Sequence, residues 1–320
     1  MSRKTITILV LSVCAFAHEG VSQNIKVQFA SNKSEYLCGE PILVRTQIAN
    51  VSSESITGKW RSYAWGKDAG FALYAGRDGN DLGDIMSMET KRNLKMSTPP
   101  MQYDLFRDRH WLPRNLSPGE MAERVDMLIV PKPGKYRLKA VLKERDGTVY
   151  ASEPIWLQVL PLEKKEDSIS KLGKQDFVIN LGSSINYAHY IERVWGGYPP
   201  GESLTAEKFK ELAPVIREQH KDSVFREYVM YAEAMVQCRP PESEFDLATT
   251  ECGKELAEQF VKEYPRSWLL PDIYRKLFWV YVQQKNKEKA EEFRKRALEA
   301  APNASVLRDV KRADIDELLR

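Results

Sequence analysis

The sequence Pro-Lys-Pro-Gly-Lys-Tyr-Arg-Leu-Lys-Ala-Val-Leu, residues 131–142, joins a turn to a strand. Two prolines and a glycine occupy three of its first four positions, and polar and apolar residues then alternate as in a half-buried strand. Another strand-like run, 124–130, precedes the turn, and the hairpin signal Asp146-Gly147 leads into a third run, 149–160. Consecutive strands joined by turns without helices between them predict a β-sandwich.

The same pattern extends toward the N-terminus. Residues 25–29 also alternate with period two, as does the second half of the run 42–48, and a polar turn follows that run. We therefore predict a β-sandwich domain over residues 24–162.

A long segment, 84–114, interrupts the alternation and is rich in Met, Pro and aromatic residues. Long loops on a rigid scaffold commonly carry binding residues. We expect this segment to be the contact surface of the sandwich, with Tyr103, Phe106 and Trp111 as binding residues.

An acidic stretch before this segment matches part of a calcium-loop template. Asp78, Asn80, Gly83 and Glu89 fall at its positions 1, 3, 6 and 12, but the fifth position is Leu82, which has no side-chain oxygen. Asp-Gly is a common hairpin turn. We expect a strand at 71–75 and a hairpin turn at Asp78-Gly79 in place of a calcium site.

Three stretches of the predicted sandwich carry a family resemblance: residues 36–44, 115–120 and 133–138. They resemble landmarks of bacterial extracellular immunoglobulin-like domains, including domains similar to the intracellular proteinase inhibitor family. The resemblance implies an immunoglobulin-like β-sandwich. It also raises protease inhibition through the 84–114 loop as an alternative function.

The spacing of apolar residues becomes helical after residue 204, and the segment 212–229 recurs 44 residues later as 256–273. This internal repeat predicts helix pairs, with a turn at 284–286 and a further helix at 288–300. The stretches 260–267 and 290–301 resemble tetratricopeptide-type repeats, whose usual period is about 34 residues. The fold class expected is therefore an immunoglobulin-like β-sandwich followed by an antiparallel, tetratricopeptide-like helical domain over 206–320. Residues 163–205 are expected to form a charged linker and leading helices.

The first residues, 1–17, predict an export signal. Arg3 and Lys4 precede an apolar run that closes on Ala15-Phe16-Ala17, the small-x-small ending that signal peptidase accepts. Cys14 stands in a sequence similar to a lipoprotein box, except that Val13 replaces a small residue. We expect a periplasmic or secreted bacterial protein, attached to the membrane only if Cys14 is lipidated.

The charge balance argues against a polyanion-binding chain. Removing residues 1–17 leaves 46 basic and 45 acidic residues, so no long-range field concentrates nucleic acid. The sequence also lacks a CxxC motif and a histidine pair at helical spacing. We predict no nucleic-acid partner, no metal and no cofactor.

The cysteines left after export are Cys38, Cys238 and Cys252. Cys238 and Cys252 bracket a loop between helices, so an oxidising compartment favours a disulfide between them, worth about 3 kcal/mol. Two thiols that merely flank an insertion are the alternative. Cys38 is expected to be a buried structural thiol.

Trp195 and Tyr198 form a second aromatic candidate site, because the glycines and prolines around them hold the rings in a loop. A wedge between the two domains is the other interpretation. With no recognisable catalytic residues, we expect a non-enzymatic scaffold protein of the cell envelope that binds a protein or peptide in a helical groove. A carbohydrate-binding protein or an unrecognised hydrolase remains an alternative, and the oligomeric state stays open.

Overall fold

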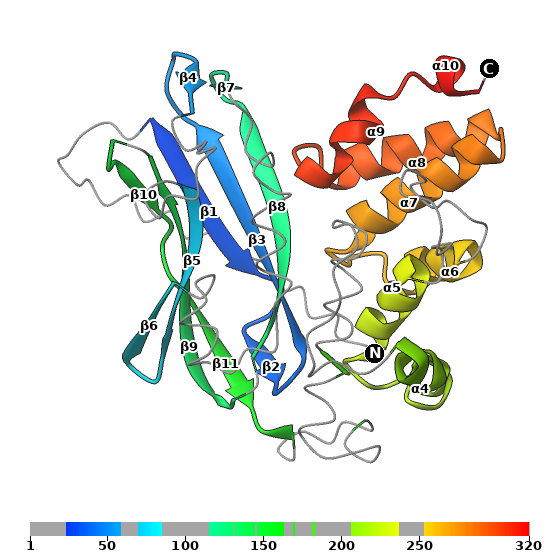
Figure 1. The fold of residues 1–320 in the computed structure, drawn as a ribbon, viewed down its shortest axis with the longest axis horizontal. Helices are drawn as coiled ribbons and strands as arrows, with labels where there is room; N and C mark the ends of the chain where they lie inside the picture. The colour runs from blue at the N-terminus through cyan, green and yellow to red at the C-terminus, as the bar shows by residue number, and fades with distance from the viewer. Residues whose placement is uncertain are drawn as a thin grey trace, which may run out of the picture.

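The computed structural model describes residues 24–58, 70–84, 115–130, 132–144, 146–162, 169, 181–182, 206–236 and 253–319. The β-rich N-terminal region precedes a helical C-terminal region, so the chain has the predicted two-part layout (Figure 1). The strands are β1 Ile25–Ser31, β2 Glu35–Leu37, β3 Pro41–Asn50, β4 Ile56–Thr57, β5 Gly70–Arg77, β6 Asn80–Asp84, β7 Asn115–Leu116, β8 Met121–Ile129, β9 Gly134–Lys143, β10 Val149–Ala151 and β11 Ile155–Leu160. The helices are α4 Ala206–Gln219, α5 Arg226–Val236, α6 Lys254–Glu263, α7 Leu270–Gln283, α8 Lys287–Ala300, the 3-10 helix η4 Ser305–Leu307, α9 Arg308–Arg312 and α10 Ile315–Leu318.

Nine of the strands form two stacked sheets, and β4 and β7 pair with each other separately. The three-stranded sheet has the order β1-β3-β8, and the six-stranded sheet has the order β2-β11-β9-β5-β6, with β10 paired to β9. Apolar side chains from alternate positions of both sheets fill the space between them, among them Ile42, Val44, Leu128 and Leu138. This alternation is the one that the sequence shows.

Two of the predicted hairpin turns are confirmed, and the third turn has a different role. Asp78-Gly79 joins β5 to β6, with φ of 50° and 87°, and Asp146-Gly147 lies between β9 and β10. Adjacent positive φ values are those of the hairpin turn whose twist matches paired strands. Residues 132–134, the described part of the third predicted turn, instead lead into β9, which lies in the other sheet from β8. Local turn chemistry specifies a reversal but not which sheet receives the next strand.

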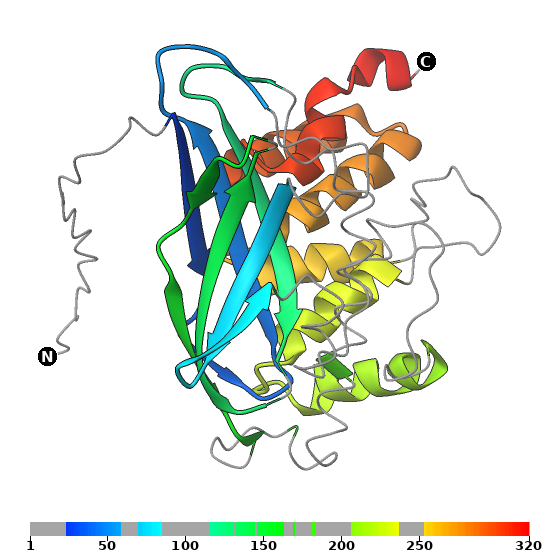
Figure 2. The ribbon, with the colours of Figure 1, turned by 60° about the vertical axis from the view of Figure 1, so that its left-hand side comes forward.

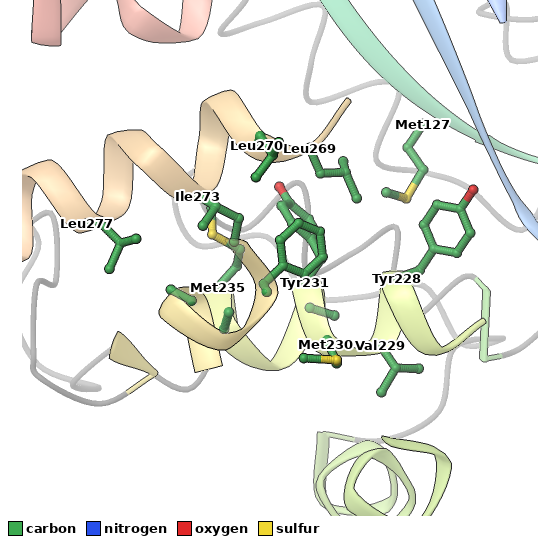
Figure 3. Close-up of a cluster of buried hydrophobic side chains, with 14 of the residues drawn as sticks. Met127, Tyr228, Val229, Met230, Tyr231, Met235, Leu269, Leu270, Ile273 and Leu277 are labelled. Atoms are coloured by element: carbon green, nitrogen blue, oxygen red, sulfur yellow. The ribbon is translucent and has the colours of Figure 1, made fainter. Parts of the chain in front are cut away.

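The helices cover the outer face of the three-stranded sheet (Figures 1 and 2). Leu43 of β3 and Met127 of β8 point away from the sandwich interior, and both are fully buried in one apolar cluster with the helices. Figure 3 shows Met127 beside Tyr228 of α5 and Leu269, which precedes α7. The two parts of the chain therefore share a hydrophobic core.

Three turns of the helical region repeat the same backbone geometry. In each, the residue that follows a helix accepts a hydrogen bond from the amide three positions later: Ser223 to His220 at 3.0 Å, Ser267 to Tyr264 at 3.1 Å and Ala304 to Ala301 at 3.1 Å. The serine Oγ atoms of the first two turns also accept from Phe225 N (3.2 Å) and Leu269 N (3.1 Å). The third turn, where alanine replaces serine, lies beyond the repeat that the sequence reveals.

Each repeated turn meets a different part of the three-stranded sheet or its edge. Near the first turn, the ring centroid of Tyr228 lies 5.7 Å from Lys33 Nζ, just after β1. Next to the second turn, Trp268 packs against Arg45 of β3, 4.2 Å from ring centroid to Cζ. In the third, the Asn303 carbonyl oxygen accepts from the amide of Glu123 in β8 at 2.9 Å. The turns are thus the docking points of the helices.

The range 163–205 also contributes to this shared core. Its described residues include Ile169 and Leu181, and both side chains are fully buried. A Cβ added to Gly182 would overlap the Gly39 carbonyl oxygen, so the backbones approach closely here. These three described positions are packed against the rest of the protein, and the remaining residues of the expected linker and leading helices lie outside the described residues.

Candidate binding face

The aromatic residues and cysteines proposed from the sequence lie outside the described residues. They are Tyr103, Phe106, Trp111, Trp195, Tyr198, Cys14, Cys238 and Cys252. Cys38 is described and fully buried, as expected, and its Sγ lies 3.8 Å from the Val130 carbonyl oxygen. Burial in the core supports a structural thiol.

The outer face of the six-stranded sheet lies on the side away from the described helices (Figures 1 and 2). Its central strand, β9, buries Tyr136, Leu138 and Ala140 and exposes the alternate residues Lys135, Arg137 and Lys139. Successive side chains of a strand point to opposite faces, so these three cations form a row with about 6.8 Å between neighbours.

Aromatic rings flank this row on the neighbouring strands. Trp156 of β11 lies directly opposite Arg137, and Tyr74 of β5 lies opposite Lys139. Trp156 is 50% exposed, which is unusual for an indole ring in a folded protein. The set Lys135, Arg137, Lys139, Tyr74 and Trp156 is called the basic-aromatic face below.

The cations of the basic-aromatic face lie near its rings. Lys135 Nζ is 4.7 Å from the centroid of Trp156, and Arg137 Cζ is 6.0 Å from the same centroid. Lys139 Nζ is 5.6 Å from the centroid of Tyr74. At exposed sites such contacts are worth only about 0.5–1 kcal/mol. An anionic ligand can therefore displace a cation from a ring at small cost.

Backbone pairing fixes the spacing of the face. Gly76 of β5 faces Arg137 from the side opposite Trp156, so no side chain occupies that position of the sheet. Gln158 lies opposite Lys135 and beside Glu35 of β2, an exposed carboxylate at the edge of the sheet. The centre of the face therefore has positive charge. Acidic positions lie at both borders, because Asp81 and Asp84 of β6 pair with Gly76 and Tyr74 on the side opposite Glu35.

The side chains of the basic-aromatic face can bind a ligand that has both an anionic group and an apolar surface. Its arginine and lysines donate hydrogen bonds to anions, and its indole ring offers an apolar surface with a polar edge. Among the described residues, no three His, Cys, Asp or Glu side chains gather where they could hold a metal ion. In the same part of the chain, no helix has the length and apolar character needed to cross a membrane.

Sequence reasoning missed this face although its signal is visible. The alternation of residues 135–142 predicts the strand, but alternation alone gives its polar positions no role in binding. Lys135, Arg137 and Lys139 share one charge sign at alternate positions, a pattern that places all three on one face. Trp156 is an aromatic residue at a polar-facing position of the next strand.

Comparisons with known proteins leave the family open. No protein-family model matches the chain. A search of curated proteins finds no significant match.

Some solved structures are similar to part of the chain. An NMR structure of the CARDB domain of the PF1109 protein from Pyrococcus furiosus is 9% identical with a TM-score of 0.24, covering 43% of this chain and 94% of that one. A crystal structure of the same domain, titled as a complex with di-metal ions, is 9% identical with a TM-score of 0.23, covering 42% of this chain and 87% of that one.

A third similar structure is Spo0M, a sporulation control protein from Bacillus subtilis. It is 11% identical with a TM-score of 0.25, and the match covers 51% of this chain and 55% of that one. The chain thus spans about half the length of Spo0M. None of these similarities bears on the function of the chain.

Proposed function

We propose that this chain is a non-enzymatic, exported binding protein of the bacterial cell envelope, and that its basic-aromatic face contacts the ligand. The observation that carries the proposal is the difference between the two outer faces of the sandwich. Helices bury Leu43 and Met127 on one side, while the other side exposes Trp156 between cations. Exposed aromatic and basic residues together are characteristic of contact surfaces.

The export part of the proposal rests on residues 1–17. Their basic start, apolar centre and Ala15-Phe16-Ala17 ending support cleavage and release to the periplasm or medium. Lipidation of Cys14 would instead tether the protein. In both cases the ligand belongs to the envelope or to the space outside it.

We propose an immunoglobulin-like fold for the β region. Its strand order supports this, because β1-β3-β8 and β2-β11-β9-β5-β6 correspond to strands A-B-E and A′-G-F-C-C′ of such a sandwich. Tyr136, near the start of β9, donates its hydroxyl hydrogen to the Lys132 carbonyl oxygen at 2.9 Å. A tyrosine at this corner, bonded to the backbone just upstream, is a hallmark of the fold.

The helical region is proposed to be tetratricopeptide-like and to support the sandwich. The repeated turns at Ser223, Ser267 and Ala304 favour stacked helix pairs. In α5, every residue from Tyr228 to Met235 is buried, so this helix is part of the core. A peptide groove on the helices, and protease inhibition through residues 84–114, stay predictions that rest on the sequence alone.

The test uses the mature protein from its own cell, checked by intact mass for the loss of residues 1–17. Tagged protein is incubated with cell-envelope material, and the retained fraction is measured for wild type and for a double variant, Arg137→Glu with Trp156→Ala. We expect retention by wild type and a loss of at least about tenfold in the variant, because an ion pair and an aromatic contact are removed together.

The matched control is Lys262→Glu with Leu318→Ala, which changes one exposed cation and one exposed apolar residue on the helices. It should be retained like wild type. Equal retention of all three proteins would refute binding through the basic-aromatic face.

A further inference from the structure

The spacing of the basic-aromatic face restricts the kind of ligand that can bind, because the register of the strands fixes the separation of its indole ring and its cations. Arg137 and Trp156 are a directly opposed cross-strand pair, so their Cβ atoms lie about 5 Å apart. A ligand that touches both needs an apolar surface and an anionic group side by side on one small unit. A sugar acid satisfies this requirement: the C–H face of its ring packs on an indole, and its carboxylate projects from the ring edge.

We propose that the basic-aromatic face binds an acidic polysaccharide built from uronic acid units, an assignment that rests on the proposed binding function. One sugar ring stacks on Trp156 while its carboxylate pairs with Arg137. The planar guanidinium suits a carboxylate because two parallel hydrogen bonds form. Lys135 and Lys139, on either side of Arg137 along β9, pair with carboxylates of neighbouring units.

The arrangement of the row favours a polymer over a single sugar. The exposed positions of β9 repeat about every 6.8 Å along a nearly straight strand. No described helix crosses this face, and the three cations stay exposed, although the next position in the row, Val141, is buried (Figure 2). A pocket for one monosaccharide would need walls, and the described strands present the outer face of a twisted sheet (Figure 2).

A single-stranded nucleic acid is the polyanion that this face fits less well. Such ligands bind to successive aromatic platforms in a strongly basic groove. Trp156 is 50% exposed. Among the described residues of this face, the other ring, Tyr74, is only partly exposed and lies beneath Lys139, so it offers no equal platform for a base. The whole chain has 48 basic and 45 acidic residues, so it lacks the long-range positive field of nucleic-acid binders.

The experiment measures binding of the full mature protein to polygalacturonate by isothermal titration calorimetry at low and high salt. The matched ligand is the same polymer with its carboxylates methyl-esterified, which keeps the sugar rings and removes the charge. A single-stranded oligo-dT serves as the polyanion of the other class. We expect binding to polygalacturonate that weakens as salt rises, at least about tenfold weaker binding to the ester, and weaker binding to oligo-dT.

Variants then locate the contact. Arg137→Glu and Trp156→Ala should each weaken binding about tenfold, Trp156→Phe should restore part of it, and Lys262→Glu should bind like wild type. The three side chains changed are exposed, and unchanged circular dichroism and unfolding midpoints would show that the four variants fold.

Three outcomes overturn the assignment. Tighter binding to oligo-dT than to polygalacturonate would identify a nucleic-acid face. Equal binding of the charged and esterified polymers would remove the role of the carboxylates. No binding to either polysaccharide, with envelope retention still lost in the Arg137 and Trp156 variants, would reject the sugar acid while leaving the proposed binding function intact.

Discussion

Tyr136 shows how a single side chain can hold the fold and respond to pH. It is 3% exposed, and its hydroxyl bonds to the backbone at Lys132. Burial raises the pKa of Tyr136 from 10.0 to about 12, against a smaller opposing effect of the Arg77 charge. The neutral phenol is therefore the form that the folded protein favours.

Replacing Tyr136 by Phe should lower the free energy of unfolding by about 1 kcal/mol below pH 10, because one buried hydrogen bond is lost. Since the folded pKa is raised, the neutral phenol contributes full stability below pH 10, and this contribution disappears as the pH rises through 12. Wild type should then lose about 2–3 kcal/mol more than Tyr136→Phe across this window. Urea unfolding at intervals from pH 8 to 12 measures both slopes, and identical slopes would contradict the assignment.

The three repeated turns of the helical region share one backbone geometry, and serine side chains reinforce two of them. Ser223 and Ser267 each cap the start of the following segment through Oγ, and the chain reverses direction between two helices at both positions. The third turn makes the same backbone bond with Ala304 in place of serine. The backbone geometry is thus common to all three turns, and the serine hydroxyl adds stability to two of them.

Changing Ser267 or Ser223 to Ala should destabilise the protein by about 1 kcal/mol each, as the loss of a capping side chain does. Thermal unfolding followed at 222 nm provides the measurement. Ser305→Ala, next to the third turn, is the control and should stay within about 0.5 kcal/mol of wild type. An effect of Ser305→Ala as large as the other two would mean that the turns are not equivalent.

At the scale of the whole molecule, the shared core makes the two regions depend on each other. Leu43 and Met127 face the helices, whereas their neighbours Ile42 and Leu128 face the sandwich interior. Both faces of β3 and β8 are therefore covered here. Separating the two regions would expose Leu43 and Met127 to solvent and create an apolar patch on the sheet.

We expect wild type to unfold in one transition, with coincident curves for far-UV circular dichroism and tryptophan fluorescence. Met127→Lys places a charge in the contact with Tyr228 and Leu269, so it should split this transition into two and lower the first midpoint. Met127→Leu, which roughly keeps the volume and apolar character, should remain cooperative. A single transition in the lysine variant would show that the regions are coupled elsewhere.

The sequence by itself determined the secondary structure and the turns with good accuracy. The helix predicted at 288–300 is α8 Lys287–Ala300, and the hairpin at Asp78-Gly79 is formed. These features depend on residues close together in the chain, where periodicity and turn chemistry act directly. The internal repeat, 212–229 and 256–273, contains the first two repeated turns. The third turn, with Ala301 and Ala304, lies outside this repeat and was not predicted.

Only the tertiary structure decided which surfaces are buried and which are free. The alternation of β9 shows that Lys135, Arg137 and Lys139 share a face. It cannot show that Trp156 lies opposite Arg137, because β10 and its turns separate β11 from β9 in the sequence and leave their register open. Nor could it show that the helices cover Met127. Contacts between residues distant in the chain follow from the packing of complete elements, and this packing leaves the basic-aromatic face open.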